Sequence, residues 1–122
     1  MRWTFDPKGD RAGFVEQPLD EHPGEFPRLD ERFAGLPYRH GYFQAGAVTD
    51  ASHGREGRNG VAHIDHHSGA VSVWRPGAAD YCGEPVFVPR SANAEEGDGF
   101  LLSVVFRGET QCSDLAVFDA HN

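Results

Sequence analysis

The residues best suited to bind a metal are the histidines, and three of the seven lie within five positions, in the segment His63-Ile64-Asp65-His66-His67. On a β-strand, successive side chains point to opposite faces, so His63, Asp65 and His67 would share one face. Two imidazoles and a carboxylate form a donor set that suits several transition metals. A metal triad is therefore one interpretation of this segment. The other is that His66 and His67 begin an exposed hairpin turn and bind nothing, and the turn is the stronger signal.

Two further motifs lack the residues that their chemistry would require. Cys112 with a histidine would make a nucleophile pair, but neither Gly-x-Ser-x-Gly nor a cysteine-protease signature accompanies it. The segment Gly54–Gly60 is rich in glycine but lacks the Gly-Lys-Ser/Thr ending and the following helix of a phosphate-binding loop. We expect it to be an ordinary loop.

Two glutamates have a more unusual setting. Glu25 begins Glu25–Phe33 and Glu84 begins Glu84–Arg90, and each follows a glycine and precedes a run with aromatic residues and proline. A carboxylate there would lie where a core strand begins or ends. Burying its charge is costly unless a donor meets it. We expect Glu25 and Glu84 either to face solvent on edge strands or to meet a specific N–H group or cation.

The elements that position these residues are predicted to be short β-strands, because 15 glycines and eight prolines are spread along the chain and no helical periodicity persists beyond about two turns. The predicted strands are Trp3–Phe5, Phe14–Gln17, Tyr38–Phe43, Val61–Asp65, Val71–Trp74, Pro85–Val88, Phe100–Phe106 and Leu115–Phe118. Val61–Asp65 and Val71–Trp74 form the clearest hairpin, with Ser68 and Gly69 in the turn. We expect solvated loops over Ala45–Asn59 and Ser91–Gly99. This pattern fits a sandwich, a barrel or part of a propeller.

Composition excludes several classes of function. The chain has 122 residues and a net charge of −8, from 11 basic and 19 acidic residues, so a nucleic-acid backbone or an acidic membrane surface is disfavoured as partner. The longest apolar run, Phe100–Phe106, is far shorter than the roughly 20 residues of a membrane span. The N-terminus lacks the features of a signal peptide, and two cysteines make no disulfide framework. We expect one small unit, or a piece of a larger one, in the cytoplasm.

In six blocks the sequence resembles the carotenoid cleavage oxygenase family, which includes apocarotenoid and lignostilbene dioxygenases. The blocks are Glu25–Phe33 with Tyr38–Tyr42, Ile64–Asp65, Ser68–Gly69, Gly83–Arg90, Ala94–Ser103 and Ser113–Ala120. Their order and spacing agree over nearly the whole chain, so the resemblance is specific although each block alone is a weak signal.

The resemblance implies an all-β fold: a partial seven-bladed β-propeller, with about two to three blades of antiparallel sheet in domain 1–122. It implies an enzyme that carries Fe(2+) on four histidines and uses O₂ to cleave a conjugated C=C bond of a carotenoid, apocarotenoid or stilbene-type substrate into two carbonyl products. Glu25 and Glu84 match two of three family glutamates that accept hydrogen bonds from the iron-bound imidazoles. Such a carboxylate fixes the tautomer and orientation of a ligand ring.

The same resemblance places the iron-binding histidines elsewhere. Three are expected before the position of Trp3 and the fourth beyond Ala120, so none of the seven histidines here falls at a ligand position; His121, after the last matched strand, is the one to check. The implication is that this chain alone does not bind Fe(2+) and is inactive. An excised arc of a propeller exposes sheet edges and apolar faces, so we expect a marginal fold or self-association. The alternatives are a non-catalytic β-module or gene remnant, and a small metal protein that uses His63, Asp65 and His67.

Overall fold

The computed structural model describes residues 1–6, 8–9, 13–19, 21–46 and 60–120. The strands are β1 (Arg2–Phe5), β2 (Phe14–Gln17), β3 (Gly24–Leu29), β4 (His40–Ala45), β5 (Gly60–Asp65), β6 (Val71–Trp74), β7 (Tyr81–Cys82), β8 (Val86–Pro89), β9 (Gly99–Arg107) and β10 (Cys112–Asp119). One short 3₁₀ turn, η1 (Glu31–Phe33), is the only helical element among the described residues. The predicted all-β class is confirmed. Within this part of the chain, no helix is long and apolar enough to span a membrane.

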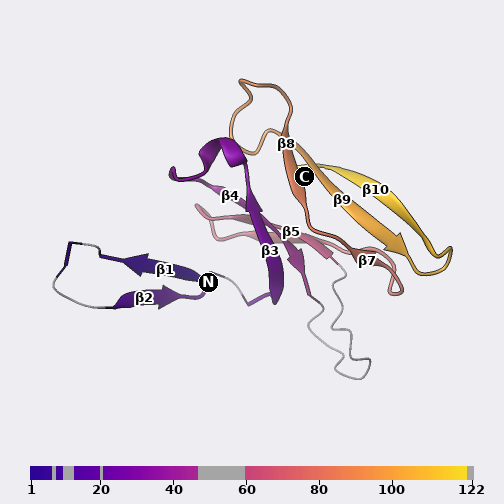
Figure 1. Ribbon diagram of the computed structural model, residues 1–122, viewed down its shortest axis with the longest axis horizontal. Coiled ribbons are helices and arrows are strands. Elements are labelled where there is room, and N and C mark those ends of the chain that lie inside the picture. The colour runs from indigo at the N-terminus through magenta and orange to yellow at the C-terminus, as the bar shows by residue number, and fades with distance from the viewer. Residues whose placement is uncertain (7, 10–12, 20, 47–59, 121–122) are drawn as a thin grey trace.

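The strands form three antiparallel sheets. β1 pairs with β2, β3 to β6 form a meander in sequence order, and β9 pairs with β10 on one side and with both β7 and β8 on the other. Figure 1 shows the β1–β2 hairpin to one side of the two larger sheets. β7 and β8 lie one after the other along β9, separated by Gly83–Pro85. Proline has no N–H group to donate to a ladder, which explains an interruption at this point.

The core lies between the two four-stranded sheets. Tyr42 and Val61 from β4 and β5 meet Phe87, Leu101 and Val105 from β8 and β9. The rings of Tyr42 and Phe87 stack at 5.5 Å with an angle of 8°. Because side chains alternate along a strand, the opposite face of β8 to β10 is also apolar, and it is exposed. This open face consists of Val86, Val88, Val104, Leu115 and Val117.

The predicted hairpin is confirmed. β5 and β6 pair in register, and Gly69 takes the turn with a φ of +76°, which a glycine adopts without strain. The structure also differs from the predicted strands at β3, β4 and β7. β4 begins at His40 instead of Tyr38, and the two-residue β7 was not expected. β3 covers Gly24–Leu29, where a strand was expected only in connection with Glu25 and no range was predicted.

The two predicted loops have different outcomes. Most of Ala45–Asn59, together with His53 and most of Gly54–Gly60, lies outside the described residues, as does His121. Ser91–Gly99 does connect β8 to β9. Ser91, Ala92, Asn93 and Glu95 are exposed, as expected for a surface connection. The loop also makes specific contacts, because the Ala94 carbonyl accepts from Arg32 and the Glu96 carboxylate accepts from the backbone of His40, as described below.

Candidate functional site

A β-bulge in β3 determines which side chains reach the seam between the two larger sheets. Glu25 pairs with Gln44 and Arg28 pairs with Tyr42, so three steps along β3 match two steps along β4. The extra residue lies next to Phe26, whose φ is +52°. In a regular strand, residues three apart point to opposite faces. Since Tyr42 and Gln44 share a face, the bulge brings Glu25 and Arg28 to that same face.

Glu84 meets Arg28 across the seam. Arg28 Nε donates to Glu84 Oε1 at 2.5 Å, and the two side chains are 37% and 38% exposed. Arg28 Nη1 also donates to Glu31 Oε1 at 3.4 Å. Glu84 thus meets a cation, one of the two outcomes expected for it. The Glu25 residue is largely exposed to solvent.

The backbone just before Glu84 is held by the neighbouring strands. Gln44 Nε2 donates to the carbonyl of Cys82, and Ser103 Oγ donates to the carbonyl of Gly83 at 3.0 Å. The N–H of Gly83 donates to the carbonyl of Val104 at 2.6 Å. These bonds fix the main chain from which the Glu84 side chain extends. Burial raises the pKa of Cys82 to about 11, so its thiol stays protonated and unreactive at neutral pH.

A cavity of about 450 Å³ opens beside Glu25 and Arg28. Its walls include Tyr38, Phe43 and His66. The His66 ring packs edge-on against Tyr38 with 5.1 Å between centroids, and burial lowers the pKa of this histidine, so it is neutral at pH 7. The lining of this cavity therefore mixes aromatic, imidazole and aliphatic residues with Glu25 and Arg28.

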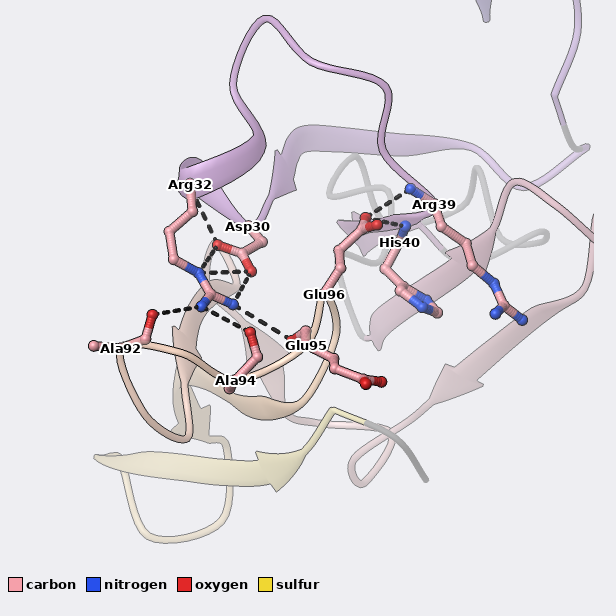
Figure 2. Close-up of polar contacts among 8 residues, drawn as sticks. All are labelled: Asp30, Arg32, Arg39, His40, Ala92, Ala94, Glu95 and Glu96. Carbon is pink, nitrogen blue, oxygen red and sulfur yellow. Dashed lines mark hydrogen bonds and ion pairs between the residues drawn. The ribbon is translucent and has the colours of Figure 1, made fainter.

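A second group of polar contacts ties the turn after β3 to the loop before β9 (Figure 2). Arg32 makes a bidentate ion pair with the buried Asp30, with Nε–Oδ1 at 2.9 Å and Nη2–Oδ2 at 2.6 Å. The same guanidinium donates to the carbonyls of Ala92, Ala94 and Glu95 at 3.2, 3.0 and 3.4 Å. The hydrogen bonds from Arg32 lower the pKa of Asp30, which stays ionised. Arg32 thus joins the connection between β3 and β4 to the loop between β8 and β9.

Glu96 completes this junction. Its Oε1 accepts from the backbone N–H groups of Arg39 and His40 at 2.6 and 2.9 Å (Figure 2). The His40 ring in turn lies with Nδ1 2.9 Å from Nε2 of His63, and the His63 ring stacks on Tyr42. Gly97 has a φ of +81° and lies against the His40 ring. Together these contacts anchor the loop to the start of β4.

The geometry does not support the metal-triad interpretation of His63, Asp65 and His67, the less favoured of the two. His63 faces His40, whereas Asp65 forms a bidentate ion pair with Arg39 at 2.9 and 2.7 Å and also accepts from the backbone of His67. The hydrogen bonds from Arg39 hold the pKa of Asp65 far below its usual value. Among the described residues, no group of three or more His, Cys, Asp or Glu side chains is arranged to hold a metal. These residues therefore do not fit the iron ion that the family resemblance implies.

Glu25 and Glu84 stand out in the sequence, but the residues that hold Glu84 and the backbone before it do not. Arg28, Gln44 and Ser103 carry no local signal, because their partners lie across the seam. Pro27 was the only hint, since proline inside a strand is confined to edges and bulges. Arg32 was missed for the same reason, because its partners Ala92 and Ala94 lie about 60 positions away in the sequence.

Comparisons with known proteins agree with the fold and the motifs. The chain is 40% identical to lignostilbene-alpha,beta-dioxygenase isozyme III of Sphingomonas paucimobilis, over 99% of this chain and 26% of that protein. It is 37% identical to carotenoid cleavage oxygenase 1 of Neurospora crassa, over 96% and 24% of the two chains.

Solved structures give the same result. Pseudomonas brassicacearum lignostilbene dioxygenase matches with a TM-score of 0.91 and 34% identity, over 100% of this chain and 27% of that one. Synechocystis apocarotenoid oxygenase, as a mutant, matches with a TM-score of 0.84 and 29% identity, over 98% and 24%. The chain thus spans about a quarter of the length of these relatives, and its sheets are part of the carotenoid oxygenase β-propeller.

The family model described as retinal pigment epithelial membrane protein covers residues 1–122. The relatives that match the same residues are named lignostilbene dioxygenase, carotenoid cleavage oxygenase and apocarotenoid oxygenase. The chain therefore belongs to the retinal pigment epithelial membrane protein family, the family of the carotenoid oxygenases.

Proposed function

We propose that this chain is part of an oxygenase that uses O₂ to cleave a conjugated C=C bond of a carotenoid, apocarotenoid or stilbene-type substrate into carbonyl products. The observation that carries the proposal is the TM-score of 0.91 with a lignostilbene dioxygenase over the whole chain. Relatives that are at least 30% identical have names that point to stilbene-type and carotenoid substrates. The alternative is a non-catalytic β-module or gene remnant.

Within that enzyme, Glu25 and Glu84 accept N–H bonds from imidazoles outside residues 1–122. In the family, those imidazoles bind Fe(2+), which supplies the chemistry with O₂. Support comes from the match to the family motifs and from the ion pair that Glu84 forms with Arg28. A carboxylate that accepts from the second nitrogen of a ligand ring fixes its tautomer and orientation. In this proposal, the chain alone neither binds Fe(2+) nor cleaves substrate.

The open face gives this proposal a structural consequence. Val86, Val104, Leu115 and Val117 are each 46% to 62% exposed on one side of β8 to β10. In the complete propeller, a neighbouring blade covers this face; in the chain alone, it drives self-association through the face and the sheet edges. The reducing cytoplasm is the proposed location, and the free thiols of Cys82 and Cys112 are consistent with it.

A hybrid enzyme tests the catalytic proposal. Residues 1–122 replace the matching quarter of the Sphingomonas paucimobilis lignostilbene dioxygenase, and cleavage of a lignostilbene is followed by absorbance together with O₂ uptake. We expect the hybrid to cleave its substrate, and Glu84→Gln or Glu25→Gln to lower the rate about 10- to 100-fold. Glu109→Gln, in the turn between β9 and β10, is the matched control and leaves the rate unchanged. A hybrid that melts like its parent but cleaves nothing would contradict the proposal and favour the non-catalytic module.

A further inference from the structure

Arg28 owes its position to the bulge in β3. Without the extra residue next to Phe26, Arg28 and Glu25 would point to opposite faces, and Arg28 would not face the seam. We propose that Arg28 is a positioning residue that holds the Glu84 carboxylate in one orientation. This inference rests on the proposed function, in which Glu84 accepts an N–H bond from an imidazole.

The geometry of the ion pair supports an orienting role. Arg28 Nε donates a hydrogen bond to Oε1 of Glu84 at 2.5 Å, and Oε2 takes no part in this hydrogen bond. A carboxylate has about four acceptor positions on its two oxygens, so one oxygen can be held while the other accepts from a second donor. A partly exposed glutamate without such a partner would populate several rotamers. Arg28 therefore selects one of them.

A stabilising role explains the Arg28–Glu84 ion pair less well than an orienting role does. Both side chains are more than a third exposed, and exposed ion pairs contribute little to the free energy of unfolding. The main chain around Glu84 is already held by Gln44 and Ser103, through the carbonyls of Cys82 and Gly83. What these bonds leave undetermined is the direction of the carboxylate, and Arg28 is the residue that contacts it. Glu84 is thereby held both at its backbone and at its carboxylate, as a precisely oriented hydrogen-bond acceptor requires.

NMR spectroscopy of the full 122-residue chain tests the orientation directly. Scalar couplings across the side chain of Glu84 report its χ1 and χ2 rotamers. We expect one rotamer in the wild-type chain, averaged couplings in Arg28→Gln, and partial recovery in Arg28→Lys, which keeps the charge. Arg90→Gln is the matched control, because Arg90 also pairs with two carboxylates, those of Asp98 and Asp119. Wild-type couplings in Arg28→Gln would overturn the proposal.

The hybrid enzyme provides a second readout that does not depend on the isolated chain. We expect Arg28→Gln to lower kcat about tenfold with KM within twofold, Arg28→Lys to recover part of the loss, and Arg90→Gln to match the wild type. If Glu84→Gln slows cleavage but Arg28→Gln does not, the positioning role is wrong. If Glu84→Gln cleaves at the wild-type rate while Arg28→Gln averages the Glu84 couplings, the proposed function is wrong and Arg28 still orients the carboxylate.

Discussion

Replacing Arg32 by alanine should destabilise the chain mainly through Asp30. The Asp30 side chain is 2% exposed, and both of its oxygens accept from the Arg32 guanidinium. Removing one partner of a buried ion pair costs about 3–5 kcal/mol, because the remaining charge is left buried. The backbone N–H of residue 32 still donates to Oδ1 in the variant, which favours the lower end of that range.

The other contacts of Arg32 contribute less. The carbonyls of Ala92 and Glu95 belong to exposed residues and can bind water once the guanidinium is gone. We therefore expect a loss of about 3 kcal/mol at pH 7, most of it from the unpaired Asp30 carboxylate. With an m-value of roughly 1.5 kcal/mol per M, the urea midpoint should fall by about 2 M. Trp74, which packs on Phe118 with 4.7 Å between ring centroids, provides a fluorescence signal for unfolding.

The pH dependence separates this explanation from a general packing defect. Arg32 lowers the pKa of Asp30 in the folded chain, so the ion pair stabilises the fold above the unfolded pKa of about 3.9. That stabilisation is lost as the pH falls through the folded pKa. The difference between wild type and Arg32→Ala should therefore shrink below about pH 4. A difference under about 1 kcal/mol at pH 7, or one that is the same at pH 7 and pH 3, would refute the reasoning.

Two further predictions concern the core and the loop. Gly69→Ala, at a turn with φ +76° and no atom near the new methyl group, should lower the free energy of unfolding by about 1 kcal/mol. Gly97→Ala should lower it by at least about 1 kcal/mol more, because its methyl group would lie 2.6 Å from the His40 ring. Equal melting temperatures of the two variants would contradict this contact. Tyr42→Phe removes a buried hydroxyl that has no hydrogen-bond partner within the described residues. Urea unfolding should therefore show an unchanged free energy of unfolding or a gain of up to about 1 kcal/mol. A clear loss would mean that the hydroxyl is hydrogen-bonded.

Strand positions were predictable where β-branched and aromatic residues run between turn residues. β5, β6 and β9 are of this kind, and their predicted bounds differ from the structure by no more than one residue. The range of β3 was not predicted because Pro27 argues against a regular strand. The structure accommodates that proline within the bulge, which no local propensity indicates.

The site was predictable only in part, for a related reason. Glu25 and Glu84 could be identified because a charge next to a core strand needs a partner. The partner itself, Arg28, depends on the face that the bulge selects and on the packing of two sheets. In the Ser91–Gly99 loop, charges suggested solvent, yet Glu96 accepts from backbone groups 56 and 57 residues away. Such long-range contacts leave no local pattern.

Anyone who wishes to splice an epitope or a fluorescent label into this protein would consider the polar connection between β8 and β9. The hold of Arg32 on the carbonyls of Ala92, Ala94 and Glu95 makes that choice a poor one here, because added residues would pull the loop off the guanidinium. The tight turn at Gly69, with open space around it, is the better place to insert one.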